Sequence, residues 1–153
     1  GHETGKASHV RQSADRDLPA VAAATVLAAT LSGLPSTIHA FATGREPLAA
    51  ARAAGTLLPG RRDRPGLVAG AVMHAGVSVF WGAVLAGALP RRATATAGAA
   101  AGLAIAALDL GVVGRRFPAI AALPTLPQVA DHVAFGVVFA VARSRWSVPV
   151  ERR

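Results

Sequence analysis

Five ionisable side chains lie in the apolar parts of this chain, and their types suit metal binding or proton transfer. They are three histidines and two aspartates, namely His39, His74, Asp109, Asp131 and His132. Ionisable groups are costly inside a lipid bilayer, so those found in apolar segments are candidates for function. Imidazole and carboxylate groups are ligands of Zn²⁺ and related divalent ions, and imidazole also exchanges protons near neutral pH.

The segments around these residues are long and contain very few charges. No Asp, Glu, Lys or Arg occurs over residues 18–44, 65–90 or 93–108, and 52% of the 153 residues are hydrophobic. A helix needs about 20 apolar residues to cross a membrane, so the first two segments are long enough, and the third becomes so when it continues through Asp109 to residue 114. A soluble helical bundle would carry charged stripes on its outer faces, which these segments lack. The sequence therefore predicts an all-α integral membrane protein.

We expect four membrane-spanning helices in an up-down bundle, because most connections between them are short. Prolines remove backbone donors and interrupt helices, so Pro127 at a first helical turn suits the start of the fourth span. The predicted spans cover residues 18–43, 66–89, 93–114 and 127–143.

Shorter segments complete the predicted organisation. A short amphipathic segment is expected on the membrane surface between the first two spans, and a short interfacial piece before the fourth. These cover residues 47–58 and 118–123. The predicted domains are a polar, disordered N-terminal tail (1–17), the four-helix transmembrane domain (18–146) and a C-terminal tail (147–153).

The expected topology brings the polar residues of all four spans into one half of the membrane. His39 and Asp109 lie near the ends of the first and third spans. His74, Asp131 and His132 lie near the starts of the second and fourth. Antiparallel neighbours place these four positions on the same side, each roughly 6–12 Å inside the boundary by helical rise. The half near the termini contains no ionisable group within the predicted spans.

Helical periodicity adds polar neighbours to this cluster. Ser78 is four residues after His74, so both lie on one stripe of the second span. Thr37 follows Pro35, where a hydroxyl can bond to backbone groups that a proline leaves free. We expect these neighbours to orient ligands or relay protons, a role assigned to Asp131, Ser78 and Thr37.

The first functional hypothesis is a metal or cofactor site. Three histidines and an aspartate would bind Zn²⁺ or another divalent metal, and two facing histidines would instead ligate a haem. The residues predicted to bind the metal or cofactor are His39, His74, His132 and Asp109.

The second hypothesis is proton-coupled transport of a small solute or ion. Histidine–aspartate pairs relay protons inside membranes, and helices interrupted by prolines such as Pro35 and Pro127 are common at transporter sites. Four spans are few for a transporter, so this hypothesis requires a dimer.

Two further hypotheses need no such site. The polar groups would form an interhelical hydrogen-bond network, such as Asp109 with His132 or His39, in an accessory structural subunit. Alternatively, an enzyme would act on lipid phosphate attracted by basic side chains, although we lean against this because no phosphatase or transferase motif is recognisable. The expected anion-attracting surface comprises Arg61, Arg62, Arg64, Arg115 and Arg116.

The chain carries a net charge of +8, but the placement of its arginines argues against nucleic acid as a partner. They cluster at the ends of apolar segments, where side chains reach lipid headgroups and set topology. Arg143 and Arg145, beside Trp146, are predicted to be one such interfacial group. The expected partners are membrane lipids and further subunits, either in a homo-oligomer or in a larger membrane complex.

The predicted location is a bacterial inner (plasma) membrane with both termini cytoplasmic. Abundant Ala, Gly and Arg with a single lysine, Lys6, is the usage of a GC-rich bacterial genome. Positive residues favour the cytoplasmic side, and those on the side of the termini number nine against seven on the other. The nine are Lys6, Arg11, Arg16, Arg91, Arg92, Arg143, Arg145, Arg152 and Arg153.

Overall fold

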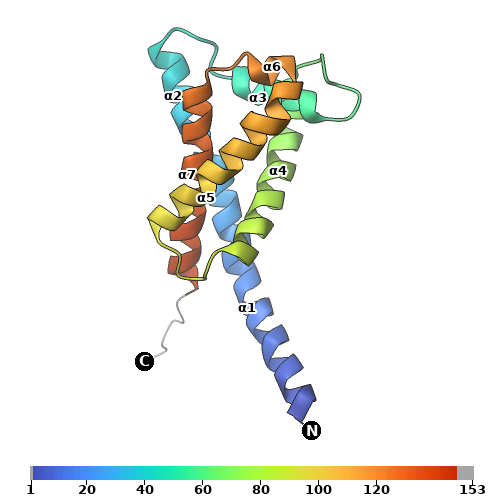
Figure 1. The fold of residues 1–153 in the computed structure, drawn as a ribbon, viewed down its shortest axis with the longest axis vertical. Coiled ribbons are helices and arrows are strands. Elements are labelled where there is room, and N and C mark those ends of the chain that lie inside the picture. Colours follow the sequence, from blue (N-terminus) through green and yellow to red (C-terminus); the bar gives the residue numbers. More distant parts are fainter. Residues whose placement is uncertain (1, 148–153) are drawn as a thin grey trace.

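Four long helices run alternately in opposite directions, as the sequence predicts (Figure 1). The computed structural model describes residues 2–147, with side chains from residue 17, and this part of the chain contains no strand. Each long helix is sufficiently long and apolar to cross a membrane. They cover Asp17–Ala42, Leu67–Ala88, Ala95–Arg116 and Thr125–Trp146, within a few residues of the predicted spans.

Several of these helices are interrupted or joined by short helical pieces. The elements in chain order are α1 (His2–Leu31), α2 (Leu34–Ala42), α3 (Ala49–Ala54), η1 (Gly55–Leu57), α4 (Leu67–Ala88), α5 (Ala95–Leu108), the π-helical turn η2 (Asp109–Val113), η3 (Gly114–Arg116), α6 (Pro118–Ala121) and α7 (Thr125–Trp146). The predicted short helices correspond to α3 with η1 and to α6. The predicted disorder of residues 1–17 stays a prediction, and 148–153 of the predicted C-terminal tail lie outside the described residues.

The first long helix breaks between α1 and α2, just before Pro35. The proline has no N–H to continue the helical ladder, so α2 begins as a new helix with this residue in its first turn. The Ser36 and Thr37 hydroxyls donate hydrogen bonds to the Gly33 carbonyl over 3.2 and 2.7 Å. The predicted interruption is therefore confirmed, and local hydroxyls bond to the backbone there.

Glycines allow α5 and α7 to meet backbone against backbone. A Cβ atom at Gly102 would collide with the His132 carbonyl, and one at Gly98 would collide with the carbonyl of Gly136. This is the close approach that small residues four apart permit between membrane helices. Asp109 is seven residues after Gly102, so the same stripe of the helix carries this carboxylate toward α7.

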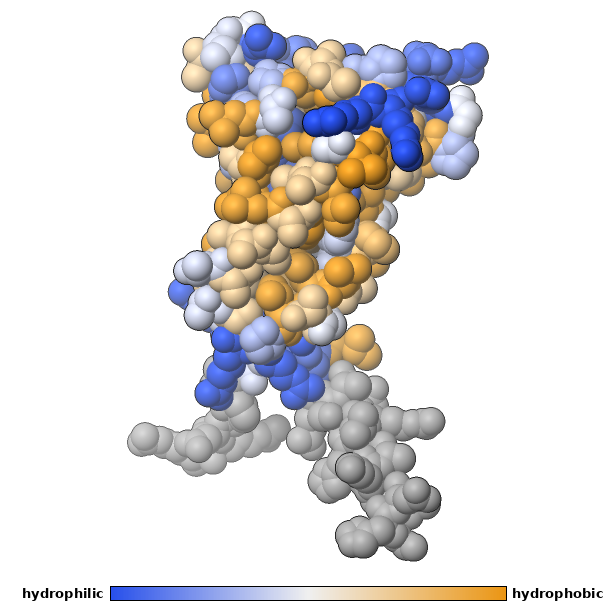
Figure 2. Space-filling view, viewed as in Figure 1, coloured by the Kyte–Doolittle hydropathy of each residue, from blue (hydrophilic) through white to orange (hydrophobic). Residues whose placement is uncertain are grey.

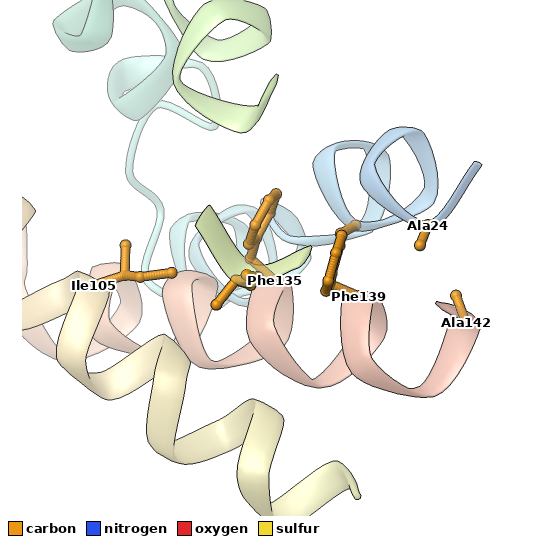
Figure 3. Packing of buried hydrophobic residues seen from close by; sticks show 7 residues of the cluster. Ala24, Ile105, Phe135, Phe139 and Ala142 are labelled. Carbon is orange, nitrogen blue, oxygen red and sulfur yellow. The ribbon is translucent and has the colours of Figure 1, made fainter. Parts of the chain in front are cut away.

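The core is small and centred on α7, which contacts α1, α2 and α5. Phe139 is fully buried, and Phe135 lies one turn away on the same face (Figure 3). Small alanines opposite these rings let the helices approach closely, which increases dispersion contacts. The cluster comprises Ala24, Ala28, Leu85, Ile105, Phe135, Phe139 and Ala142.

Large apolar side chains cover the outside of the bundle between two polar ends. Figure 2 shows this belt as an orange zone bounded by blue residues at both ends. Val68, Leu126 and Phe41 are 81%, 79% and 71% exposed, so large apolar side chains remain on the surface outside the small buried core. An exposed apolar area of this extent marks a surface that meets other apolar matter.

The end of the bundle near the termini holds a buried ion pair, which corrects the expectation for Arg143. Its Nη2 donates to Asp17 Oδ2 over 2.6 Å, and its Nη1 donates to the Leu89 carbonyl over 3.2 Å. Arg91 Nε lies 3.4 Å from the same carboxylate oxygen, and Ser147 Oγ donates to the other. Arg143 is thus a buried cross-link rather than an interfacial side chain, because Asp17 compensates its charge.

Candidate functional site

The centre of the site is a contact between the end of α5 and the first half of α7. Asp109 begins the π-helical turn η2, a backbone irregularity that occurs often at functional sites. Its Oδ2 accepts a hydrogen bond from Trp81 Nε1 over 2.9 Å and lies 3.4 Å from His132 Nε2. The expected contact of Asp109 with His132 is confirmed, and both side chains are only partly exposed.

The second nitrogen of the His132 ring fixes where its proton lies. Nδ1 is 2.7 Å from the Gln128 carbonyl oxygen, which can only accept, so Nδ1 carries a hydrogen. In a neutral ring with this tautomer, Nε2 would present a lone pair to an ionised Asp109. Two lone pairs facing each other in apolar surroundings repel, so a proton on Nε2 would stabilise this contact. The Asp109–His132 pair therefore has the geometry of a proton-binding site.

Asp131 turns away from this pair and toward α2. Its Oδ1 accepts a hydrogen bond from the Ser36 backbone N–H over 2.9 Å. The first N–H groups of a helix have no partner within the helix, and a carboxylate is well suited to accept from them. Asp131 thus caps α2 from a distant part of the chain.

His74 satisfies the opposite end of the same break. Its Nε2 donates to the Ala29 carbonyl over 2.8 Å, near the C-terminal end of α1, where carbonyls lose their helical partners. Ser78 is buried on the same helix as His74, and the Thr37 hydroxyl donates to the Gly33 carbonyl. Within the described residues, neither hydroxyl hydrogen-bonds to Asp109 or His132.

His39 lies apart from the pair and lines an open cavity of about 480 Å³ at the end of the bundle away from the termini. Walls from α2, α3, α6 and the start of α7 surround this cavity. Two wall residues connect the cavity to His132 and Asp131. The Gln128 carbonyl accepts from the His132 ring, and the Ser36 backbone N–H donates to the Asp131 carboxylate. The polar lining consists of Ser36, His39, Arg45, Glu46, Arg52 and Gln128.

The structure thus divides the predicted ligand set. Asp109 and His132 come together, whereas His74 contacts α1 and His39 faces the cavity. In the part of the chain with described side chains, no group of three or more His, Cys, Asp or Glu residues is placed to hold a metal ion.

The predicted anion-attracting arginines lie at the same end as the cavity but do not line it. Arg62 stacks over the Phe117 ring at 6.0 Å, and Arg61 lies against Gly66. Arg64, Arg115 and Arg116 are exposed.

The cavity uses arginines that the sequence analysis did not single out, Arg45 and Arg52. Their signal was position, since one follows the first span directly and the other interrupts the amphipathic segment. Trp81 was also missed as a partner of Asp109, because a hydrogen bond across helices leaves no spacing signal, and Gln128 was missed although it lies four residues before His132 in the same helix.

The fold and site together define an all-helical protein with four potential membrane helices and a His–Asp pair next to a cavity. No protein-family model, curated protein or solved structure significantly matches the chain.

Proposed function

We propose that this chain is an integral membrane protein that couples proton binding at the Asp109–His132 pair to the passage of a small solute. Insertion is supported by the exposed apolar belt and by the length of the four helices. The positive residues favour a bacterial inner membrane with cytoplasmic termini, as argued from the sequence. The protein works as a homodimer, because four helices are few to enclose a path.

The observation that carries the proposal is the orientation of the His132 ring. Its Nδ1 donates to the Gln128 carbonyl, so Nε2, 3.4 Å from Asp109 Oδ2, is the ring nitrogen placed to take up a proton next to this carboxylate. Gaining or losing this proton changes the charge of the pair by one unit in apolar surroundings, which is an energetically large change. A helix contact that depends on this charge provides a means of coupling protons to conformation.

The position of the cavity supports coupling to a solute. Gln128 lines the cavity and bonds to His132, while Ser36 lines it and bonds to Asp131. A solute in the cavity would therefore contact residues that are hydrogen-bonded to His132 and to Asp131. Transporters commonly place solute and proton sites beside interrupted helices, and α2 begins at such an interruption.

The proton site is tested by NMR of the ¹⁵N-labelled histidine rings in detergent or nanodiscs. In the wild type, we expect the His132 ring nitrogens to report a proton shared with the Asp109 carboxyl. In Asp109→Asn, the amide replaces the proton acceptor, so His132 should titrate alone. A neutral His132 beside an ionised Asp109 throughout the accessible pH range would contradict the proposal.

Proton movement is tested with the full chain in vesicles that contain a pH-sensitive dye, under a potassium diffusion potential. Asp109→Asn should reduce proton flux to the level of protein-free vesicles. Asp63→Asn is the matched control, because Asp63 is exposed in the loop before α4. Equal flux through the wild type and Asp109→Asn would overturn the proton-coupled role.

Metal or haem binding is a separate hypothesis, and the geometry lends it no support. Elemental analysis and an absorption spectrum of the purified protein test it directly. Stoichiometric zinc or a Soret band would favour that hypothesis over proton coupling.

A further inference from the structure

We infer that the cavity binds a small amphipathic anion, a carboxylate or phosphate group on a short apolar body. The claim that this anion is transported rests on the proposed function, whereas its binding to the cavity does not depend on transport. Three features of the cavity support this ligand: the charges that line it, its apolar walls and its hydrogen bond to the Asp109–His132 pair.

The cavity lining carries a surplus of positive charge. Arg52 Nε lies 3.5 Å from Glu46 Oε1, so these two side chains largely neutralise each other. Arg45 has no counter-ion among the described side chains, and the His39 ring has no hydrogen-bond partner there. Guanidinium groups bind carboxylate and phosphate in a planar, two-point geometry. One unneutralised arginine beside a free imidazole is therefore a receptor for a single anionic group.

The remaining walls select an apolar body. Alanines and prolines, among them Ala40, Ala53 and Pro127, form most of the lining, and Leu123 adds a larger apolar side chain. The volume of about 480 Å³ is in the range of small-molecule sites. The cavity lies at the polar end of the apolar belt, so a ligand there meets charged residues and apolar walls at once.

The cavity wall is hydrogen-bonded to the Asp109–His132 pair, so transport of the anion can be coupled to binding of a proton at this pair. Gln128 belongs to the wall and accepts the His132 Nδ1 hydrogen over 2.7 Å. An anion moving through apolar surroundings is costly unless its charge is compensated. A proton held at Asp109–His132 provides this compensation one hydrogen bond away from the cavity.

Binding is measured by isothermal titration calorimetry on the full chain in phosphatidylcholine nanodiscs. Three probes share one skeleton and differ in charge: 4-phenylbutyrate, 4-phenylbutyramide and 4-phenylbutylamine. We expect the acid to bind roughly tenfold or more tightly than the amide, since hydrogen bonds to charged groups are the stronger kind. The amine should not bind.

Two arginine variants locate the binding. Arg45→Gln should weaken binding of the acid roughly tenfold. Arg115→Gln removes the same charge from the same end of the molecule outside the cavity, so it should leave the affinity unchanged. Equal affinity for acid and amide, or equal losses in both variants, would overturn the inference.

Repeating the titration in phosphatidylglycerol nanodiscs distinguishes the sources of the anion. If a lipid headgroup occupies the cavity, the anionic lipid will compete and lower the apparent affinity for the acid. If the ligand is water-soluble, the affinity will be the same in both lipids. Both outcomes support an anion site. Absence of anion binding with proton flux still lost in Asp109→Asn would overturn this inference alone.

Discussion

At the scale of single residues, Arg143 illustrates how a charge is buried in this protein. Its guanidinium bonds to Asp17 and to the Leu89 carbonyl, so the first and fourth long helices and the turn after α4 meet at one side chain. A buried ion pair adds little net stability, but removing one partner leaves the other charge uncompensated.

Replacing Arg143 with Met leaves Asp17 with Arg91 and Ser147 as partners, so we expect the loss of the charged hydrogen bond to lower the free energy of unfolding by about 1–3 kcal/mol. Titration of the purified protein with SDS, followed by circular dichroism, measures this change. Arg145→Met is the control, because Arg145 is exposed and its loss should cost less than about 0.5 kcal/mol. Equal effects of the two substitutions would show that Arg143 is not buried as described.

The sequence predicted the long helices that carry the polar residues more successfully than the contacts between those residues. Helical rise gave the common depth of the polar residues, and the contact of Asp109 with His132 was expected as one alternative. Rotation about each helix axis and the choice of rotamer are set by packing, which one sequence does not encode at short range. His74 therefore bonds to α1 and His39 faces the cavity.

At the scale of elements, the close glycine contact between α5 and α7, called the seam below, positions the Asp109–His132 pair. Gly98 and Gly102 meet Gly136 and the His132 carbonyl without room for a methyl group. The small-residue pattern was visible in the sequence, but such patterns arise often by chance in a chain rich in Ala and Gly. The π-helical turn at Asp109 leaves no comparable pattern, because it depends on how η2 meets its neighbours.

Gly102→Ala should separate α5 from α7, at a cost of about 1–3 kcal/mol in unfolding free energy. It should also change the titration of His132, since the seam sets its distance from Asp109. Gly76→Ala provides the comparison, because a Cβ there meets nothing within 4 Å. The latter substitution should be neutral or stabilising by about 0.5–1 kcal/mol, as for alanine in an open helix interior. SDS unfolding of both variants tests the difference, and equal stabilities would contradict the seam.

At the scale of the whole molecule, the apolar belt separates two polar ends with different contents. The end near the termini contains the Asp17–Arg143 ion pair, and the other end contains the cavity and the Asp109–His132 pair. The alternation of apolar segments and short connections was sufficient to predict this layout. The cavity was not predictable, since its walls come from α2, α3, α6 and α7 together.

The proposed topology predicts that the turn after α4 and the loop before it lie on opposite sides of the membrane. The chain contains no cysteine, so single cysteines can be introduced at Arg92 and Arg62 without further changes. A membrane-impermeant maleimide applied to intact cells should label Arg62→Cys and spare Arg92→Cys, because the proposed topology places the termini and the turn in the cytoplasm. Labelling of both positions in intact cells would contradict four alternating spans.

The Asp17–Arg143 pair also has a consequence for biosynthesis. Its acidic partner begins the first apolar helix, and its basic partner lies in the last turn of the fourth. The two cannot meet until nearly the whole chain has been synthesised. Until then, each charge needs water or another partner near the membrane boundary. A chain without its fourth long helix would lack the Arg143 partner of Asp17, so the ion pair distinguishes a bundle with all four long helices from one without the last.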